Sequence, residues 1–111
     1  MSERKEIGKI KSVTLGYGGY QEAMLGFTFT LGSKKGSWGV GDFKGMWTTT
    51  SKGAKWTEDD RTLEFGKAMR FVWELMKDAN VQTLDDLNGV PIEVTFDANM
   101  LKSWRILKEV I

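Results

Sequence analysis

TEDDRTLEFGKAMRFVWELMKDA, residues 57–79, is the stretch that decides the fold class. Thr57, with Asp60 three residues later, forms a capping-box pattern, and the acids of the first turn complement the helix dipole. Apolar residues then recur at three- and four-residue spacing opposite a charged side, which predicts one long amphipathic helix. Its expected core face consists of Leu63, Phe65, Ala68, Met69, Phe71, Val72, Leu75, Met76 and Ala79.

Two further residues of this segment carry expectations about packing. Trp73 lies within the predicted helix and is expected in the core, as is Trp104 in a later segment. Gly66 costs about 1 kcal/mol relative to alanine in a helix, which suggests that it packs closely against a strand.

Two strands are predicted upstream of the helix. Residues 7–17 end in an alternation that places Val13, Leu15 and Tyr17 on one face, and residues 25–31 alternate Leu and Phe with Gly and Thr. The glycine pair at residues 18–19 supplies a turn between them, because glycine accepts a positive φ without steric cost. The two segments therefore predict an antiparallel pair.

Two more strands are predicted downstream. Residues 90–96 alternate strictly, with Pro91 pointing away from the apolar face, which indicates an edge strand or the start of a strand. Residues 83–89 repeat the helix-capping pattern, which predicts about one helical turn that ends at a glycine. A turn is predicted at residues 97–99, and residues 102–110 are predicted to form the last strand. The order β-β-(β)-α-β-β predicts an α+β fold in which an antiparallel sheet of four to five strands packs against one long helix.

Length and composition narrow the chemistry. A chain of 111 residues fits a single domain, residues 1–111, that is long enough to bury a core. It has no cysteine and no histidine, which removes disulfides, thiolate chemistry, histidine-dependent triads and the usual ligands of zinc, haem and iron–sulfur clusters. Oxygen-only sites for Mg²⁺ or Ca²⁺ stay open. We therefore expect a protein without enzymatic activity and without a cofactor.

The chain carries no sign of a membrane segment. No stretch approaches the roughly 20 apolar residues of a membrane span. The charged residues 1–6 have no apolar segment behind them, so no secretory signal is predicted. The expected location is the cytoplasm.

Charge and glycine are divided unequally between the two halves. Residues 1–56 carry nine Lys and Arg against four Asp and Glu, whereas residues 57–111 carry seven against eleven. Eleven of the thirteen glycines also lie in residues 1–56. The two halves therefore differ in net charge and glycine content, although they are expected to share one core.

Residues 32–56 are the candidate partner-binding segment. A turn is predicted at residues 33–36, a third strand can start at Trp38 and Val40, and the remainder is expected to be a long connection of the kind that is often functional. The candidate site residues are Lys34, Lys35, Trp38, Asp42, Phe43, Lys44, Trp47 and Trp56.

Three interpretations of this segment stay open. Exposed aromatic residues flanked by glycine are typical anchors of protein interfaces. Lysines interleaved with aromatic residues also have the composition of a single-strand nucleic-acid surface, although the overall charge of +1 weakens that case. The third interpretation is structural, with the tryptophans anchoring a loop to the core and the lysines solvated.

Other motifs have simpler explanations. The glycine-rich residues 16–20 and 39–45 match neither the dinucleotide-binding nor the P-loop pattern, so turns or bulges explain them better. The acids at residues 58–60 and 85–86 could hold Mg²⁺ or mimic phosphates toward a basic partner, but helix N-terminal charges explain all five.

Four segments resemble parts of small, functionally uncharacterised proteins encoded by tailed phages and prophages. They are GYGGYQ (residues 16–21), GDFKGMW (41–47), WTEDDR (56–61) and LKSWRIL (101–107). The resemblance spans residues 7–111 and supplies no catalytic residues. It implies a protein that acts in the cytoplasm of a bacterial host by binding and disabling a host protein, as anti-CRISPR and related anti-defence inhibitors do.

The sequence therefore predicts a non-enzymatic, phage-derived interaction protein that binds and modulates a bacterial host protein or nucleoprotein complex. The alternative is a single-stranded nucleic-acid-binding module that uses residues 32–56. No membrane partner is expected. Edge strands and exposed aromatic residues are compatible with a homodimer, and the sequence leaves the oligomeric state open.

Overall fold

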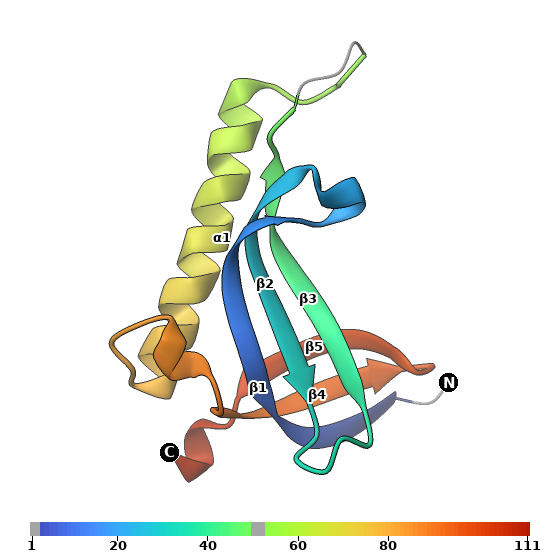
Figure 1. Ribbon diagram of the computed structural model, residues 1–111, viewed down its shortest axis with the longest axis vertical. Helices are drawn as coiled ribbons and strands as arrows, with labels where there is room; N and C mark the ends of the chain where they lie inside the picture. The colour runs from blue at the N-terminus through green and yellow to red at the C-terminus, as the bar shows by residue number, and fades with distance from the viewer. Residues whose placement is uncertain (1–2, 50–52) are drawn as a thin grey trace.

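A computed structural model describes residues 3–49 and 53–111, in which one long helix packs against a five-stranded antiparallel sheet (Figure 1). The strand order in the sheet is β3-β2-β1-β4-β5. The strands are β1 (Glu3–Gly18), β2 (Met24–Gly32), β3 (Gly39–Trp47), β4 (Pro91–Asp97) and β5 (Met100–Ile106), and the helix is α1 (Glu58–Ala79). Short 3₁₀ turns are η1 (Tyr20–Glu22), η2 (Asp85–Leu87) and η3 (Lys108–Val110). The predicted α+β fold with one long helix is confirmed.

Strand β1 is the spine of the sheet. Its first half pairs with β4 from Glu3 to Lys9, and its second half pairs with β2 from Lys9 to Gly18. Lys9 pairs with both strands, and a bulge between Ile10 and Ser12 follows directly, within the part that pairs with β2. A bulge inserts one extra residue and bends the strand. The side chains that face the core therefore belong to even-numbered residues before the bulge and to odd-numbered residues after it. One strand therefore serves two half-sheets that lie at an angle to each other.

The bend brings the two ends of the sheet together. Strands β3 and β5 are the two edges, yet Trp104 of β5 donates its Nε1–H to Oδ2 of Asp42 in β3 at 2.8 Å. Figure 1 shows β5 passing behind β2 and β3, with α1 lying along the remaining open side. The sheet is thus a partly closed barrel with α1 beside the gap. Its core contains Ile10, Val13, Phe27, Phe29, Leu31, Ala68, Val72, Leu75, Ala79, Leu87, Ile92, Val94, Phe96 and Ile106.

Helix α1 begins as its sequence predicts. The Thr57 hydroxyl accepts the Asp60 N–H at 3.1 Å, and the Asp60 carboxylate accepts the Thr57 N–H at 2.8 Å, which completes the capping box. The helix ends at Asn80 in the left-handed conformation.

The core face of α1 is narrower than predicted. Only Ala68, Val72, Leu75 and Ala79 are buried, while Leu63, Met69 and Trp73 are exposed, so those three core assignments are wrong. The expected packing of Gly66 against a strand is also wrong, because an added Cβ there would meet nothing within 4 Å. The reason is that α1 touches β3, β2 and β5 along a single narrow stripe.

Strand β3 is longer than predicted. It runs from Gly39 to Trp47 and pairs with β2 along its whole length, although its glycines favoured a loop. Pairing with an existing strand overrides weak local propensity. The connection to the helix is therefore shorter than expected, and its residues 50–52 lie outside the described residues.

Strands β4 and β5 and the turn between them lie close to their predicted positions. Pro91 starts β4, which is an inner strand, so the strand-start interpretation is confirmed and the edge interpretation is wrong. The predicted turn at residues 97–99 forms with positive φ at both Ala98 and Asn99. The last strand ends at Ile106 instead of Val110, because the chain turns into η3. In the part of the chain described, no helix has the length and apolar character needed to cross a membrane.

Two facing glycines fix the spacing of β2 and β3. Gly26 pairs with Gly45, and a Cβ on Gly26 would collide with the backbone of Lys44 and Gly45. Gly16, which pairs with Gly26 from the other side, has no atom within 4 Å of its Cβ position. A side chain is therefore sterically excluded at Gly26 but has room at Gly16.

We predict that Gly26→Ala lowers the free energy of unfolding by about 1–3 kcal/mol, because the backbone must shift to admit the methyl group. Gly16→Ala is the matched control and is expected to be neutral or slightly stabilising, since glycine weakens a strand interior. Urea denaturation of both variants measures the difference. Equal stability of the two variants would contradict the steric explanation.

Candidate functional site

Strand β3 presents its predicted site residues on two opposite faces of the sheet. Asp42 and Lys44 point toward the side of α1, where Lys44 lies over the Phe71 ring at 4.9 Å from its centroid. Phe43 lies on the other face against Gly18, whose Cβ position is 3.0 Å from the ring. Because side chains alternate along a strand, Trp47 shares the face of Phe43. The predicted segment therefore does not form one continuous surface.

The residues before β3 lie at the lower end of the sheet. Ser33 is buried, and its hydroxyl accepts the N–H of Ser37 at 2.7 Å, which orders the turn. Trp38 packs edge-on against Phe96 with ring centroids 5.4 Å apart and is half-buried. Lys34 and Lys35 are exposed on the turn. Trp38 therefore anchors the β2–β3 turn to the core, as the structural interpretation of this segment expects.

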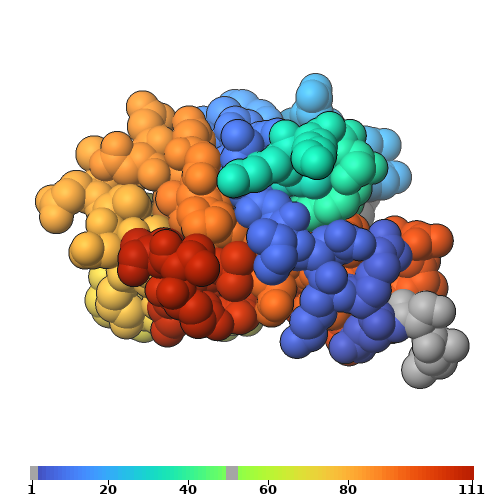
Figure 2. Space-filling view, turned by 90° about the horizontal axis from the view of Figure 1, so that it is seen from below, coloured from blue at the N-terminus to red at the C-terminus, as the bar shows by residue number. Residues whose placement is uncertain are grey.

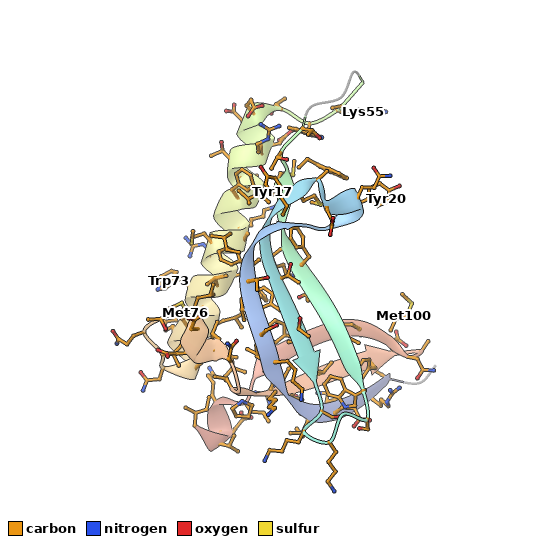
Figure 3. The ribbon with its side chains drawn as sticks, viewed as in Figure 1. Tyr17, Tyr20, Lys55, Trp73, Met76 and Met100 are labelled. Carbon is orange, nitrogen blue, oxygen red and sulfur yellow. The ribbon has the colours of Figure 1, made fainter. Side chains whose placement is uncertain are left out.

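The remaining predicted aromatic residues lie near the upper end. Trp47 contacts Tyr20 edge-on at 5.9 Å, and the guanidinium of Arg61 lies over the Trp56 ring at 4.7 Å. Lys55 and Tyr20 mark this end in Figure 3. The nucleic-acid interpretation stays a prediction, but its aromatic rings are divided between both ends and both faces of the sheet.

Asp42 and Lys44 belong to a cluster that joins three elements. Phe29, Phe71 and Trp104 are in mutual ring contact, with centroids 5.3–5.7 Å apart. Asp42 accepts the Trp104 indole N–H and lies 3.7 Å from Lys44 Nζ. The charged groups therefore cap an aromatic cluster at the point where β3, α1 and β5 meet.

Two open hollows lie on either side of Lys44 and Phe71. The first, of about 360 Å³, separates β3 from α1, and we call it the β3–α1 groove. It is lined by Phe43, Lys44, Gly45, Glu64, Lys67, Ala68 and Phe71. The second, of about 210 Å³, separates β3 from β5 and reaches Lys102 and Ser103. Both hollows combine an aromatic floor with lysines at the rim.

A third hollow, of about 310 Å³, lies at the lower end of the molecule. Ile7, Pro91, Leu107 and Val110 give it apolar walls, and Lys34 contributes to its lining. Figure 2 shows this end, where the C-terminal turn, the N-terminal part of β1 and the β2–β3 turn come together. Lys34 is thus far along β3 from Trp47 and does not share a site with it.

The largest exposed apolar feature of the helix was missed by the sequence analysis. Leu63, Met69 and Trp73 are 57%, 60% and 54% exposed on the side of α1 that faces away from the sheet, where Trp73 is visible in Figure 3. Together with Gly66 and Arg70 we call these residues the outer stripe. Hollows of about 330 and 390 Å³ flank Gly66 along it.

The outer stripe carries positive charge around its central aromatic residue. The guanidinium carbon of Arg70 lies 5.6 Å, and Nζ of Lys77 lies 5.0 Å, from the centroid of Trp73. Lys67 lines both the β3–α1 groove and one hollow of the stripe, so the two surfaces are continuous. The sequence does contain an indication of this second surface, because the apolar arc of residues 63–76 is wider than one core-facing stripe requires.

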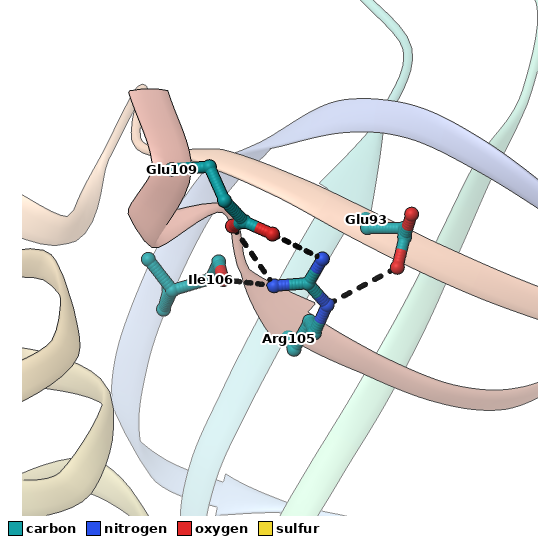
Figure 4. A network of polar contacts seen from close by, with 4 residues as sticks. All are labelled: Glu93, Arg105, Ile106 and Glu109. Atoms are coloured by element: carbon teal, nitrogen blue, oxygen red, sulfur yellow. Dashed lines mark hydrogen bonds and ion pairs between the residues drawn. The ribbon is translucent and has the colours of Figure 1, made fainter. Parts of the chain in front are cut away.

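Arg105 organises the C-terminal turn (Figure 4). It donates two hydrogen bonds to the carboxylate of Glu109, at 3.0 and 2.8 Å, and one to Glu93 at 3.1 Å. The paired guanidinium lowers the pKa of Glu109 to about 2, chiefly through these hydrogen bonds. The network joins β4, β5 and η3.

Comparison of the chain with protein-family models, with curated protein sequences and with solved structures gave no match. Among residues 3–49 and 53–111, no three Asp or Glu side chains lie close enough together to hold a metal ion. The geometry therefore offers surfaces of mixed aromatic, apolar and basic character as the candidate sites.

We predict that Asp42→Ala lowers the free energy of unfolding by about 1.5–3 kcal/mol, because it removes the charged acceptor of the Trp104 indole N–H. Asp42→Asn keeps an acceptor of the same shape and is expected to lose less. Chemical denaturation followed by tryptophan fluorescence measures both. If the two substitutions were equally mild, the hydrogen bond between β3 and β5 would have no part in closing the sheet.

We predict that the Glu109 carboxyl titrates with a midpoint near 2 in place of its ordinary 4.5. Because the pKa is depressed in the folded state, the contribution of this pair is complete above pH 4.5 and is lost as the pH falls through 2. Carbon-13 NMR of the side-chain carboxyl follows the titration. Arg105→Lys is expected to move the midpoint back toward 4.5, and an ordinary midpoint in the unaltered protein would contradict the assignment.

Proposed function

We propose that this chain is a non-enzymatic interaction protein that binds a bacterial host protein, or a protein–nucleic acid complex, and modulates it. The observation that carries the proposal is the outer stripe, on which a tryptophan, a methionine and a leucine are exposed on a helix that already has a separate core face. A helix that only covers a sheet needs one apolar stripe. The second stripe is therefore available to a partner.

The composition of the outer stripe supports a protein partner. Tryptophan, methionine and arginine are the residue types enriched at the centres of protein interfaces. Trp73 is the central anchor, with Met69 beside it and Arg70 against its ring. Lys67 and Lys77 are each paired with a glutamate of the helix, at 2.9 and 3.2 Å. The exposed Arg70 over the Trp73 ring favours a partner surface that is apolar at its centre and carries an acidic group beside it.

The β3–α1 groove extends this surface. Lys67 is shared by the stripe and the groove, and β3 forms the far wall at residues 43–45. Lys44 directs its side chain over Phe71 there, whereas the Phe43 ring lies on the opposite face of the sheet. Lys44, held over Phe71, lines both hollows, and Asp42, which accepts the Trp104 indole N–H, lines the adjoining hollow between β3 and β5. Of the residues predicted from sequence, this proposal retains Lys44 at the partner-binding surface, with Asp42 in the adjoining hollow.

The resemblance to small proteins of tailed phages gives the proposal its setting. It implies that the partner is a bacterial protein and that binding disables it, which includes an anti-CRISPR-like anti-defence role.

The test is affinity capture from bacterial lysate with the full chain as bait. The double variant Met69→Ala/Trp73→Ala is expected to lose the captured partner, since an interface anchor contributes about 2 kcal/mol or more. The matched control is Met100→Ala/Val110→Ala, which removes apolar side chains elsewhere that are somewhat more exposed than Met69 and Trp73, and it is expected to keep the partner. The groove variant Lys44→Ala is expected to weaken capture.

Two outcomes would contradict the proposal. If the stripe variant captured the partner as well as the control variant, the outer stripe would not be the binding surface. If nuclease treatment removed all captured material, and oligonucleotides quenched tryptophan fluorescence in a salt-dependent manner, nucleic-acid binding would be the better account.

A further inference from the structure

The upper half of β1 has an open edge. Pairing with β4 ends at Lys9, and the backbone of Ile10 makes the last contacts on that side, with Val90 and Gly89 at 3.0 and 2.7 Å. From Ser12 to Gly18, β1 pairs with β2 alone among the described strands. An open strand edge presents unpaired N–H and C=O groups, which form a template for a further strand.

The direction of these backbone groups follows from Ile10. Its N–H and C=O point away from β2, because they bond to Val90 and Gly89. Along a strand, the face on which the side chain lies and the side toward which the backbone N–H and C=O point both alternate from one residue to the next. Residues whose side chains share the inner face of Ile10 therefore also point their N–H and C=O away from β2. After the bulge these residues are Val13, Leu15 and Tyr17, whose N–H and C=O groups therefore point to the open edge.

This edge lacks the usual protections against pairing. Residues 12–18, SVTLGYG, contain no charged residue and no proline. Leu15 and Tyr17 are 61% and 71% exposed, because α1 packs on β3, β2 and β5 and leaves this part of the inner face uncovered. The edge is thus open in its backbone and apolar in its side chains.

We propose that a second copy of this chain occupies the edge, through antiparallel pairing of β1 with β1 across a two-fold axis at Leu15. This register sets Leu15 opposite Leu15, and Val13 opposite Tyr17, of the two copies. All of these residues direct their backbone groups outward, as an antiparallel ladder requires. Val13 with Tyr17 is an aromatic–β-branched cross-strand pair, which is a favourable combination.

Charge complementarity at the ends of the segment favours a second copy as the occupant. The nearest charged residues are Lys11 below the segment and Glu22 in the turn above it, and both are exposed. Neither takes part in an ion pair within the described part of the chain. In this register Lys11 of each copy lies opposite Gly19 of the other copy, three residues before Glu22, so the two opposite charges lie at the same end of the ladder. The surface is therefore self-complementary, and it differs from the outer stripe.

The test uses one position with two opposite charges. Leu15→Lys and Leu15→Glu each place like charges directly opposite across the two-fold, so each variant alone is expected to raise the dimer dissociation constant by about tenfold or more. An equimolar mixture sets Lys opposite Glu and is expected to restore the dimer. Met100→Lys, a substitution at a more exposed residue of β5, is the control and is expected to leave association unchanged.

Analytical ultracentrifugation over a dilution series measures the mass against twice the 12.6 kDa of the chain. Hydrogen exchange of the unaltered protein gives a second readout, in which the amides of Val13, Leu15 and Tyr17 gain protection as concentration rises. A monomer at every concentration, or an unprotected Leu15 amide in a dimer, would overturn the proposal. A mixture of the two charged variants that stays monomeric would overturn the register at Leu15.

Discussion

The bulge in β1 between Ile10 and Ser12 is the constraint on which the rest of the structure depends. It allows one strand to pair with β4 over its first half and with β2 over its second, at an angle that a regular strand would not permit. Because of this angle the two outermost strands approach each other, and Trp104 can reach Asp42. The aromatic cluster at the gap, the β3–α1 groove and the open upper edge of β1 all follow from the same bend.

The elements that local patterns specify were predicted well. Thr57 and Asp60 identified the start of the helix, since a capping box is a short-range signal, and the alternation of residues 25–31 and 90–96 identified β2 and β4. Strand β3 was underestimated because its glycines have low strand propensity, and only the partner strand β2 makes them regular. The exposure of Trp73 was missed because periodicity shows that a helix has an apolar side, but not how much of that side a sheet can cover.

The candidate site shows the same limit. The sequence pointed to residues 32–56, and within them Phe43 and Lys44 line the β3–α1 groove while Asp42 lines the hollow between β3 and β5. Alternation along β3 then sends Trp47 to the opposite face, while Trp38 packs on Phe96 and Trp56 is covered by Arg61. Which aromatic residues are available depends on contacts between segments far apart in the chain. A composition-based argument cannot see those contacts, and the outer stripe of α1 lay outside the segment that composition selected.

The dual pairing of β1 also has a consequence for the order in which the chain folds. Strands β1, β2 and β3 are consecutive and pair through short connections, so they can form as soon as the first half of the chain leaves the ribosome. The lower half of β1 pairs with residues 91–97, which are synthesised much later. During that interval the side of β1 that later pairs with β4 is an open strand edge, and the charged residues Glu3, Arg4, Lys5 and Glu6 disfavour its pairing with another chain. Charged residues in the first half of β1 thus protect a strand edge whose partner is not yet synthesised.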